Sequence, residues 1–440
     1  RWETVTMSGK TYDAVVIGSG VIGSSITYEL ARRGMRTLTI DRNGGAGLGS
    51  TSFSSAIVRF TYSTYPGVAM SYEGLRYWEN WADHLQLPNG ADLAKFRQCG
   101  MVTLKTVGGH HLKVVPHFDS IGIPYEDWDL EAFEFHLPEL DLHKFGPPKR
   151  PDDNEFWKEP SELLEGGLFT PEAGYVSDPQ LAADNLYLAA ATLGCEFRFK
   201  TEVTAIMRSD GKVTGVGLGD GSFISTPVVV NAAGPHSRFV NEMAGALDDM
   251  SIRTTPLRQE VHHVPIPVEL DFENRGFSIA DDDNGIYVRP DLGDNVLVGS
   301  TEPDCDPLHW VDPDYEGQID IQQWEAQVLR LNRRLPAVGI PHQRRGIVGV
   351  YDVSDDWIPI YDRTCVDGFY VAIGTSGNQF KNAAIAGHCM SELIDAVENG
   401  RDHDSDPVSV TGPHTGLTID MGNFRRSRTI NPESSMSVHG

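Results

Sequence analysis

The chain has 440 residues, of which 40% are hydrophobic and 22% charged, and its formal net charge is −26. This composition is typical of a globular protein rather than a disordered or fibrous one, and so acidic a surface disfavours nucleic acid and anionic membranes as partners. Because one hydrophobic core rarely grows beyond roughly 250–300 residues, we expect two domains.

The first predicted elements, over residues 13–41, are a strand, a glycine-rich turn, a helix and a second strand. The turn has the pattern G-x-G-x-x-G, in which Gly18 makes the tight turn, Gly20 admits a pyrophosphate and Gly23 lets the helix pack closely on the strand. The free N–H groups at the start of the helix suit phosphates, and Asp41, which ends the second strand, is placed for ribose hydroxyls. This order of elements predicts a dinucleotide site without separating NAD from FAD.

The central part of the chain alternates between helical and strand-like patterns. Residues 65–110 are typical first of a helix and then of a strand, whereas residues 112–175 are irregular and rich in Pro, Asp and Glu, so we expect them in a second domain or a lid. Apolar residues at helical spacing follow over 179–193. Residues 195–234 and 252–300 are rich in strand patterns, the first with SDGK and GDGS as hairpin turns.

The last part of the chain contains two more predicted helices, over residues 318–334 and 383–398. The tail from Gly400 is polar and rich in Gly, Pro, Ser and Asp, so we expect it to wrap or fray at the surface. No segment approaches the roughly 20 apolar residues that span a bilayer. The opening RWETVTMSGK lacks the apolar core of a signal peptide, and because it starts without Met we expect a processed or trimmed chain, with Met7 as an internal start.

A second nucleotide-type segment favours FAD. Residues 225–237, STPVVVNAAGPHS, form an apolar strand that breaks into small residues at Ala233 and Gly234. This resembles the second FAD-contacting strand of glutathione-reductase-type flavoproteins. Val203, in the strand before it, matches the family position whose backbone meets the adenine. Taken alone, the segment fits a buried strand that ends in a turn equally well. Its position after the glycine motif favours FAD.

Three further segments carry a closer resemblance. They are GSTSFSSAIVRF at residues 49–60, GIVGVYDVSDDWIPI at residues 346–360 and AIGTSGNQFKN at residues 372–382. Together with the nucleotide motif they make the chain similar to the glycine/D-amino-acid oxidase superfamily, and within it to the sarcosine oxidases, especially the β subunit of the heterotetrameric form. The resemblance implies an α/β fold: a Rossmann-like FAD-binding domain of glutathione-reductase type and a second, antiparallel-sheet (α+β) substrate domain.

The alternation of nucleotide-type and β-rich segments predicts domains built from discontinuous pieces. We expect a FAD-binding domain from residues 10–100, 175–250 and 340–400, a substrate-binding domain from 101–174 and 251–339, and a C-terminal tail from 401–440.

The resemblance also implies the residues that hold the substrate. In the similar enzymes an arginine and a lysine at the positions of Arg59 and Lys381 grip a carboxylate, which suits a guanidinium fork and an ammonium point charge. The alternatives are a surface ion pair or a phosphate contact for Arg59, and a helix cap for Lys381. Tyr351 is expected in the pocket wall or at the substrate, the alternative being a buried strand tyrosine.

Weaker candidates are Tyr287, Arg258 and one of His262 and His263. The predicted cofactor contacts are Gly18, Gly20, Val21, Ile22, Gly23, Asp41, Arg42, Ser50, Thr51, Ser54, Ser55, Val203, Ala233, Gly234, Gly349, Gly377, Asn378, Gln379, Phe380 and Lys381.

Some positions depart from the family pattern. The cysteine that tethers the flavin in monomeric sarcosine oxidase falls at Gly349, and the tethering histidine of dimethylglycine dehydrogenase falls near Ser54, so we expect non-covalent FAD. The lysine that promotes reaction with oxygen falls at Leu297, and a family histidine falls near Thr301. Rapid use of oxygen is therefore not expected. Asn378-Gln379 replaces the usual His-Gly, which bears on the choice of substrate.

The predicted function is FAD-dependent oxidation of the C–N bond of a small amino acid or N-alkyl amino acid, by hydride transfer to flavin N5 and hydrolysis of the imine. The alternatives are oxidation of a 2-hydroxy acid or a sugar-linked amine, a flavin subunit or dehydrogenase that passes electrons to a partner other than oxygen, and an NAD enzyme. We expect a carboxylate-bearing amine as substrate and a homo-oligomer or hetero-subunit assembly. Five scattered cysteines without zinc spacing favour the cytoplasm and no metal.

Overall fold

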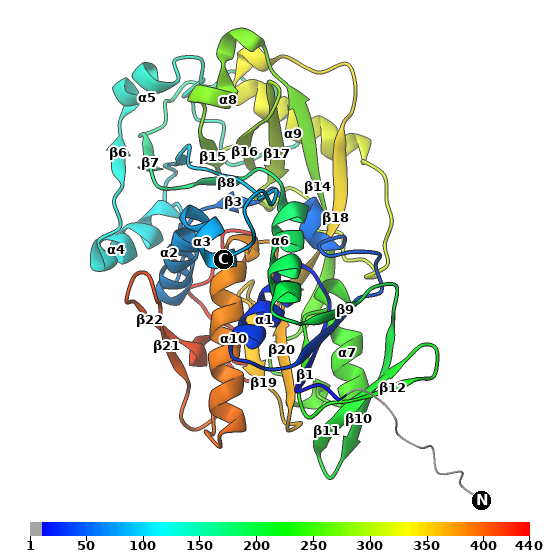
Figure 1. The fold of residues 1–440 in the computed structure, drawn as a ribbon. Helices are drawn as coiled ribbons and strands as arrows, with labels where there is room; N and C mark the ends of the chain where they lie inside the picture. The colour runs from blue at the N-terminus through cyan, green and yellow to red at the C-terminus, as the bar shows by residue number, and fades with distance from the viewer. Residues whose placement is uncertain (1–10) are drawn as a thin grey trace, which may run out of the picture.

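The computed structural model describes residues 11–440 of the chain (Figure 1). The expectations about a signal peptide and an internal start concern residues 1–10 and lie outside the described residues. Two large sheets organise the described part, one of six strands and one of eight. In Figure 1 the six-stranded sheet occupies the lower half and the eight-stranded sheet the upper half. The predicted α/β fold class, with a Rossmann-like part and a largely antiparallel part, is confirmed.

The six-stranded sheet has the order β19-β20-β13-β1-β2-β9, and its neighbours run parallel except β19 and β20. Its strands are β1 (Ala14–Ile17), β2 (Thr37–Ile40), β9 (Glu196–Arg198), β13 (Val229–Asn231), β19 (Ile360–Arg363) and β20 (Phe369–Ile373). Every residue of β1, β2, β13 and β20 is buried, because parallel strands are covered on both faces.

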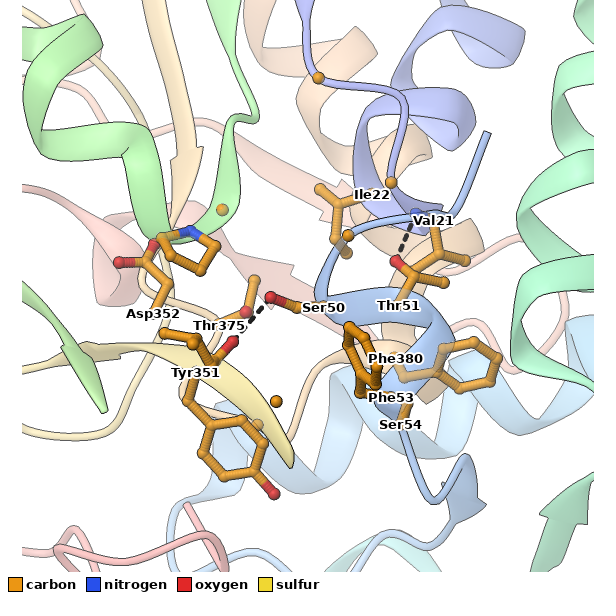
Figure 2. A pocket seen from close by; sticks show the side chains of 18 of the residues that line it. Val21, Ile22, Ser50, Thr51, Phe53, Ser54, Tyr351, Asp352, Thr375 and Phe380 are labelled. Atoms are coloured by element: carbon orange, nitrogen blue, oxygen red, sulfur yellow. Dashed lines mark hydrogen bonds between the residues drawn. The ribbon is translucent and has the colours of Figure 1, made fainter. Parts of the chain in front are cut away.

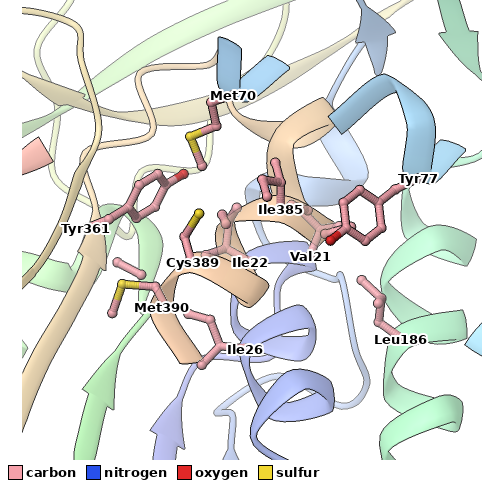
Figure 3. Packing of buried hydrophobic residues seen from close by; sticks show 14 of the residues in the cluster. Val21, Ile22, Ile26, Met70, Tyr77, Leu186, Tyr361, Ile385, Cys389 and Met390 are labelled. Atoms are coloured by element: carbon pink, nitrogen blue, oxygen red, sulfur yellow. The ribbon is translucent and has the colours of Figure 1, made fainter. Parts of the chain in front are cut away.

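One face of this sheet is covered by three helices: α1 (Val21–Arg32), α6 (Pro179–Thr192) and α10 (Ala383–Glu398). The helix α1 packs against both α6 and α10. Figure 3 shows this core, where Ile22 and Ile26 lie beside Cys389 and Met390. The helices predicted over residues 179–193 and 383–398 are thus confirmed.

The eight-stranded sheet has the order β18-β14-β17-β16-β15-β5-β7-β6 and is antiparallel except where β15 meets β5. Its strands are β5 (Met101–Leu104), β6 (Glu126–Trp128), β7 (Gly167–Thr170), β14 (Thr254–Pro265), β15 (Ser278–Asp281), β16 (Ile286–Asp291), β17 (Asn295–Ser300) and β18 (Gly346–Ser354). The helix predicted over residues 318–334 is confirmed as α9 (Ile321–Arg334), which packs on β14, β16 and β17.

The remaining elements connect and flank the two sheets. The small strands are β3 (Ile57–Val58), β4 (Phe96–Arg97), β8 (Gly174–Val176), β10 (Val203–Ser209), β11 (Lys212–Leu218), β12 (Phe223–Ser225), β21 (Ser409–Thr411) and β22 (Thr418–Asp420). The other helices are α2 (Tyr65–Glu79), α3 (Trp81–Leu85), α4 (His111–Ile121), α5 (Leu130–His136), α7 (Ser237–Ala244) and α8 (Phe272–Arg275). No helix within residues 11–440 is long and apolar enough to cross a membrane.

The division into domains stays a prediction, but strand pairing bears on the position of one boundary. The strand β18 pairs with β14 in the eight-stranded sheet, although the expected boundary at residue 340 assigns it to the FAD-binding segments. We therefore propose that this boundary falls after β18, near residue 355.

The tail differs from a frayed segment. Over residues 401–440 it forms the β21–β22 hairpin and is tied to the body by buried ion pairs, such as those of Arg426 with Asp362 and of Arg428 with Asp356. The carboxylate of Glu73 on α2 accepts hydrogen bonds from the backbone of His414 and Thr415. Of the two expectations, a tail that wraps fits the structure, because paired charges keep it on the protein.

Candidate active site

A cavity of about 1020 Å³ lies beside the start of α1. The carboxyl ends of β1, β2 and β13 form one wall, and the segment 48–57, the strand β18 and the turn at 377–381 form the others. Ligands of open parallel sheets bind at this edge of the strands. The volume is at the upper end of the range for small-molecule sites, roughly 300–1,000 Å³, as an extended ligand requires.

The glycine motif closes the end of the cavity at β1. Gly18 has a φ of +103°, and a Cβ on it would lie 2.3 Å from the carbonyl oxygen of Ala232. A Cβ on Gly23 would lie 1.9 Å from the carbonyl oxygen of Gly18. Neither backbone atom can move aside, so both positions need glycine for the strand, turn and helix to pack this closely. Gly23 does not itself line the cavity, in keeping with the packing task predicted for it.

The first turn of α1 is open to a ligand. Its N-cap, Gly20, has no side chain, and within the described residues only Thr51 reaches the turn, its Oγ1 accepting the N–H of Val21 at 3.0 Å (Figure 2). The N–H groups and positive dipole at such a helix start attract phosphate. A Cβ on Gly20 would point at Thr51 Oγ1 from 3.2 Å. Bare backbone and positive dipole together fit a pyrophosphate.

Asp41 joins the glycine turn to the segment after β2. One carboxylate oxygen accepts the N–H of Ser19 at 2.7 Å and its hydroxyl at 2.9 Å, and the other accepts the N–H of Asn43 at 2.7 Å. The next residue, Arg42, forms an ion pair with Asp314, which belongs to the segment 313–317 at the cavity wall. The predicted ribose-binding acid thus also fixes the shape of the turn.

The segment 49–55 is held by strands of the other sheet. Ser50 donates a hydrogen bond to the carbonyl of Val350 at 2.6 Å, as Figure 2 shows. A Cβ on Gly349 would lie 2.9 Å from the Cβ of Phe53, and one on Gly377 would lie 2.3 Å from the ring of Tyr351. The glycines on this side therefore let β18, the segment 49–55 and the turn at 377–381 approach one another around the cavity.

Arg59 and Lys381 lie together on the cavity wall. The guanidinium carbon of Arg59 is 4.7 Å from the centre of the Tyr62 ring, and the amine of Lys381 is 5.1 Å from it. Both side chains are buried. Burial lowers the pKa of both groups, and the charge of Arg59 lowers the pKa of Lys381 further.

The hydrogen bonds of these two cations go to neutral groups. Arg59 donates to the carbonyls of Thr61, Val438 and His439 at 2.9, 2.6 and 3.2 Å. Lys381 donates to the carbonyl of Asn378 at 2.6 Å. Two buried cations whose partners are carbonyls leave a local excess of positive charge, which an anionic ligand would neutralise.

Acidic and phenolic groups lie on the cavity wall or just behind it. Burial and the neighbouring Tyr287 raise the pKa of Tyr351 well above its ordinary value. Burial raises the pKa of Asp352 to about 7, although its carboxylate accepts the N–H of Gly374. Burial likewise raises the pKa of Glu302 to about 8. Burial outweighs the nearby charge of Arg59, which lowers the pKa of Tyr351, and titratable groups perturbed in this way are common at functional sites.

All the predicted site residues except Gly23 and Asn378 line the cavity. The side chain of Asn378 instead contacts the carbonyl of Trp357 and the amide of Gln379. Their roles toward a cofactor or substrate stay predictions.

Among the weaker candidates the structure separates one tyrosine from the rest. Tyr287 lines the cavity, and its hydroxyl lies 2.7 Å from that of Ser55. Arg258 and His262 lie instead on either side of the buried Glu260, and His263 pairs with Asp291. Among the described residues Thr301 lines the cavity, whereas Leu297, at the position of the oxygen-promoting lysine, does not.

Sequence reasoning missed several wall residues: Phe53, Asp352, Val438 and His439 line the cavity, and Glu302 lies behind it. Asp352 and Phe53 stand inside the segments that carry the family resemblance and could have been added. The tail residues carry no local signal, because a polar segment without periodicity gives no indication of where it returns to the fold.

Known proteins resemble this chain in both sequence and structure. Residues 13–393 match the model of the DAO family, described as FAD dependent oxidoreductase. Glycine oxidase of Geobacillus kaustophilus is 26% identical over 91% of this chain and 97% of its own length. Sarcosine oxidase subunit beta of Rhodobacter capsulatus is 24% identical over 89% of this chain and 88% of its own.

The structural likeness agrees with the sequence matches. The crystal structure of glycine oxidase from Geobacillus kaustophilus gives a TM-score of 0.70 over 90% of this chain and 97% of its own, with 21% identity. The structure of L-alpha-glycerophosphate oxidase from Mycoplasma pneumoniae with FAD bound gives a TM-score of 0.70 over 88% of this chain and 95% of its own, with 16% identity. At these identities the structures show a shared fold.

Proposed function

The chain belongs to the DAO family of FAD-dependent oxidoreductases and is an FAD-dependent amino-acid or amine oxidoreductase; from this premise we propose that it oxidises the C–N bond of a small amino acid or an N-alkyl amino acid to an imine, which water then hydrolyses. The substrate carries a carboxylate, and its Cα–H or N-alkyl C–H is the bond that loses hydride. FAD, when bound, accepts that hydride at N5 of its flavin ring.

The observation that supports this proposal most is the pair of buried cations. Arg59 and Lys381 flank the ring of Tyr62 on the wall of the same cavity that the glycine motif enters. In a chain of net charge −26, an anionic substrate needs such a local site to enter. We propose that Arg59 binds the two carboxylate oxygens through its guanidinium fork and that Lys381 adds a point charge.

The remaining residues would hold the cofactor and shape the pocket. We propose that the first turn of α1 takes the pyrophosphate, that Asp41 takes the ribose hydroxyls, and that Tyr351 forms a pocket wall. FAD is held without a covalent bond in this proposal, since Gly349 and Ser54 stand where relatives carry the tethering side chains. A cytoplasmic location also stays a prediction.

The test is the visible spectrum of the purified protein followed by anaerobic addition of glycine, sarcosine, L-proline and D-alanine. We expect a yellow protein whose flavin is released by acid precipitation and is bleached by at least one of these amines. A flavin that stays oxidised with all four but is bleached by 2-hydroxy acids would contradict the proposal. Flavin that remains with the precipitate would contradict non-covalent binding.

A second candidate concerns the electron acceptor. The relatives named sarcosine oxidase subunit beta and the leucine at position 297 favour a flavin-carrying subunit or a dehydrogenase that delivers electrons to a partner other than oxygen. Reoxidation of the bleached protein distinguishes the two forms. Rapid recovery of the yellow colour in air supports an oxidase, whereas recovery only with an artificial acceptor such as a quinone supports the second candidate.

A further inference from the structure

The segment Ser434–Gly440 returns from the surface into the cavity. Within it, Val438 and His439 belong to the cavity wall. The ring of His439 pairs with Asp282 at 2.7 Å and stacks on the ring of His110 with 4.6 Å between centroids. The carbonyl of Gly440 accepts hydrogen bonds from the backbone and hydroxyl of Ser63. In Figure 1 the mark C lies between the two halves of the molecule.

Val438 contacts the protein as a free amino acid would. Its N–H donates to a carboxyl oxygen of Glu302 at 3.0 Å, and its C=O accepts from the guanidinium of Arg59 at 2.6 Å. An α-amino acid has the same sequence of groups: a nitrogen that donates, one carbon, and carboxylate oxygens that accept. The peptide residue thus occupies both ends of a site with the polarity of an amino acid.

Glu302 has the features of a residue held in place for a ligand. Its φ of +52° lies in the left-handed region that a residue with a side chain rarely adopts, and its N–H donates to the hydroxyl of Ser300. Both hydrogen-bond donors to its carboxyl are neutral, the amide of Gln259 at 2.9 Å and the N–H of Val438. A buried carboxyl whose hydrogen-bond donors are both neutral favours an ammonium group, which donates as a cation.

We propose that Glu302 and Arg59 are the two ends of an α-amino-acid site, in which Glu302 accepts hydrogen bonds from the substrate nitrogen and Arg59 binds the carboxylate, and that the segment Ser434–Gly440 fills this site as an internal substrate mimic until substrate displaces it. The inference rests on the proposed function for the class of ligand alone. It assigns to Glu302 the choice of amino acids over plain carboxylic acids, and to the tail a competition with substrate.

The binding experiment uses the FAD-loaded protein without residues 434–440. The flavin is first reduced chemically, so that no amine can be oxidised. Titrations with glycine, sarcosine, L-proline and D-alanine are then compared with acetate and propionate, which lack the amine, and calorimetry reports binding. We expect at least one amino acid to bind about tenfold or more tightly than its acid. No preference for any amino acid would overturn the assignment of Glu302, whether or not any amine reduces the oxidised flavin.

The substitution Glu302→Gln in the shortened chain separates charge from shape. We expect it to weaken amino-acid binding about tenfold and to change acetate binding less than twofold. Glu269→Gln, which alters an exposed carboxylate, is the matched control and should leave both unchanged. Equal weakening of amino acid and acetate would indicate a structural role and contradict the proposal. Because binding is measured on reduced flavin, failure of any amine to bleach the oxidised flavin would count against the proposed function and not against this site.

The tail is tested in the full chain by hydrogen exchange. Saturating amino acid should increase amide exchange at Val438 and His439, and the peptide Ser-Ser-Met-Ser-Val-His-Gly should compete with the amino acid for the shortened chain. Should the shortened chain fail to fold, Val438→Pro in the full chain removes the N–H donated to Glu302 and the valine side chain that packs beside Leu257 and Val353, and should tighten amino-acid binding. Unchanged exchange at Val438 with bound amino acid, or a peptide that does not compete, would overturn the role of the tail.

Discussion

The two ends of the cavity are built differently. At the end next to β1, one short segment shapes the cavity. Gly18 and Gly20 let its backbone lie close to the neighbouring segments, and the carboxylate of Asp41 holds the turn through Ser19. At the other end, Arg59 and Lys381 come from positions far apart in the chain. Arg59 donates to carbonyls of the tail, and Lys381 donates to the carbonyl of Asn378 in its own turn. The first end depends on close packing of backbone, and the second depends on buried charge.

The largest effect is expected where packing is tightest. Gly23→Val would place a Cβ only 1.9 Å from the carbonyl oxygen of Gly18, so the strand, turn and helix could not pack together. We expect protein without bound flavin, measured by visible absorption and by circular dichroism. Gly45→Ala, whose Cβ would meet nothing closer than 3.5 Å, should keep its flavin. A yellow Gly23→Val protein would remove the contrast between the two ends.

The next effect tests the cost of buried charge at the other end. Asp352 has its pKa raised from 3.8 to about 7 by burial. A raised folded-state pKa means that stability is fully present below the unfolded pKa and is lost as pH rises toward the folded one. Asp352→Asn cannot ionise and does not lose this stability. The difference in free energy of unfolding, variant minus wild type, should therefore rise by roughly 2–4 kcal/mol between about pH 4 and pH 7, because a tenfold change in proton affinity corresponds to about 1.4 kcal/mol.

Denaturant unfolding at several pH values measures this difference. The exposed hairpin variant Asp210→Asn controls for the change from acid to amide. If the difference between Asp352→Asn and the wild type is independent of pH, the carboxyl is not strained by burial, and the proposed contrast between the ends is weakened.

A third effect concerns the carboxylate site. Arg59→Lys keeps a positive charge but removes the planar fork, so a substrate carboxylate loses one of two hydrogen bonds. We expect KM to rise roughly 100-fold, equivalent to about 2–3 kcal/mol, while the flavin content stays that of the wild type. Arg36→Lys, at an exposed ion pair with Asp13, serves as control. Loss of flavin together with substrate binding would place Arg59 at the cofactor instead.

The smallest effect is expected at Tyr351. Removing its hydroxyl by Tyr351→Phe keeps the ring against Gly377 and leaves Tyr287 its contact with Ser55. We expect kcat/KM to change about threefold or less, since one neutral hydrogen bond contributes about 1 kcal/mol. Tyr175→Phe, at a buried tyrosine outside the described lining, is the comparison. A fall of 100-fold in Tyr351→Phe alone would make the hydroxyl a catalytic group.

The sequence by itself determined the nucleotide end and the fold class. The strand, glycine turn, helix, strand and Asp41 are contiguous, and their chemistry is local, since Gly18 and Gly23 are needed for backbone contacts formed within a few residues or with the adjacent strand. Similarity over the segments 49–60, 346–360 and 372–382 extended this to most of the cavity wall.

Only the tertiary structure decided what surrounds the substrate end. Nothing local marks Glu302 or Val438, because their importance lies in a hydrogen bond between residues 136 positions apart. Composition also left open whether the polar tail wraps or frays, since it reports average exposure and does not show that Arg426 and Arg428 find buried carboxylates. Charges far apart in sequence become partners only when the chain has closed, and that is why local patterns cannot predict them.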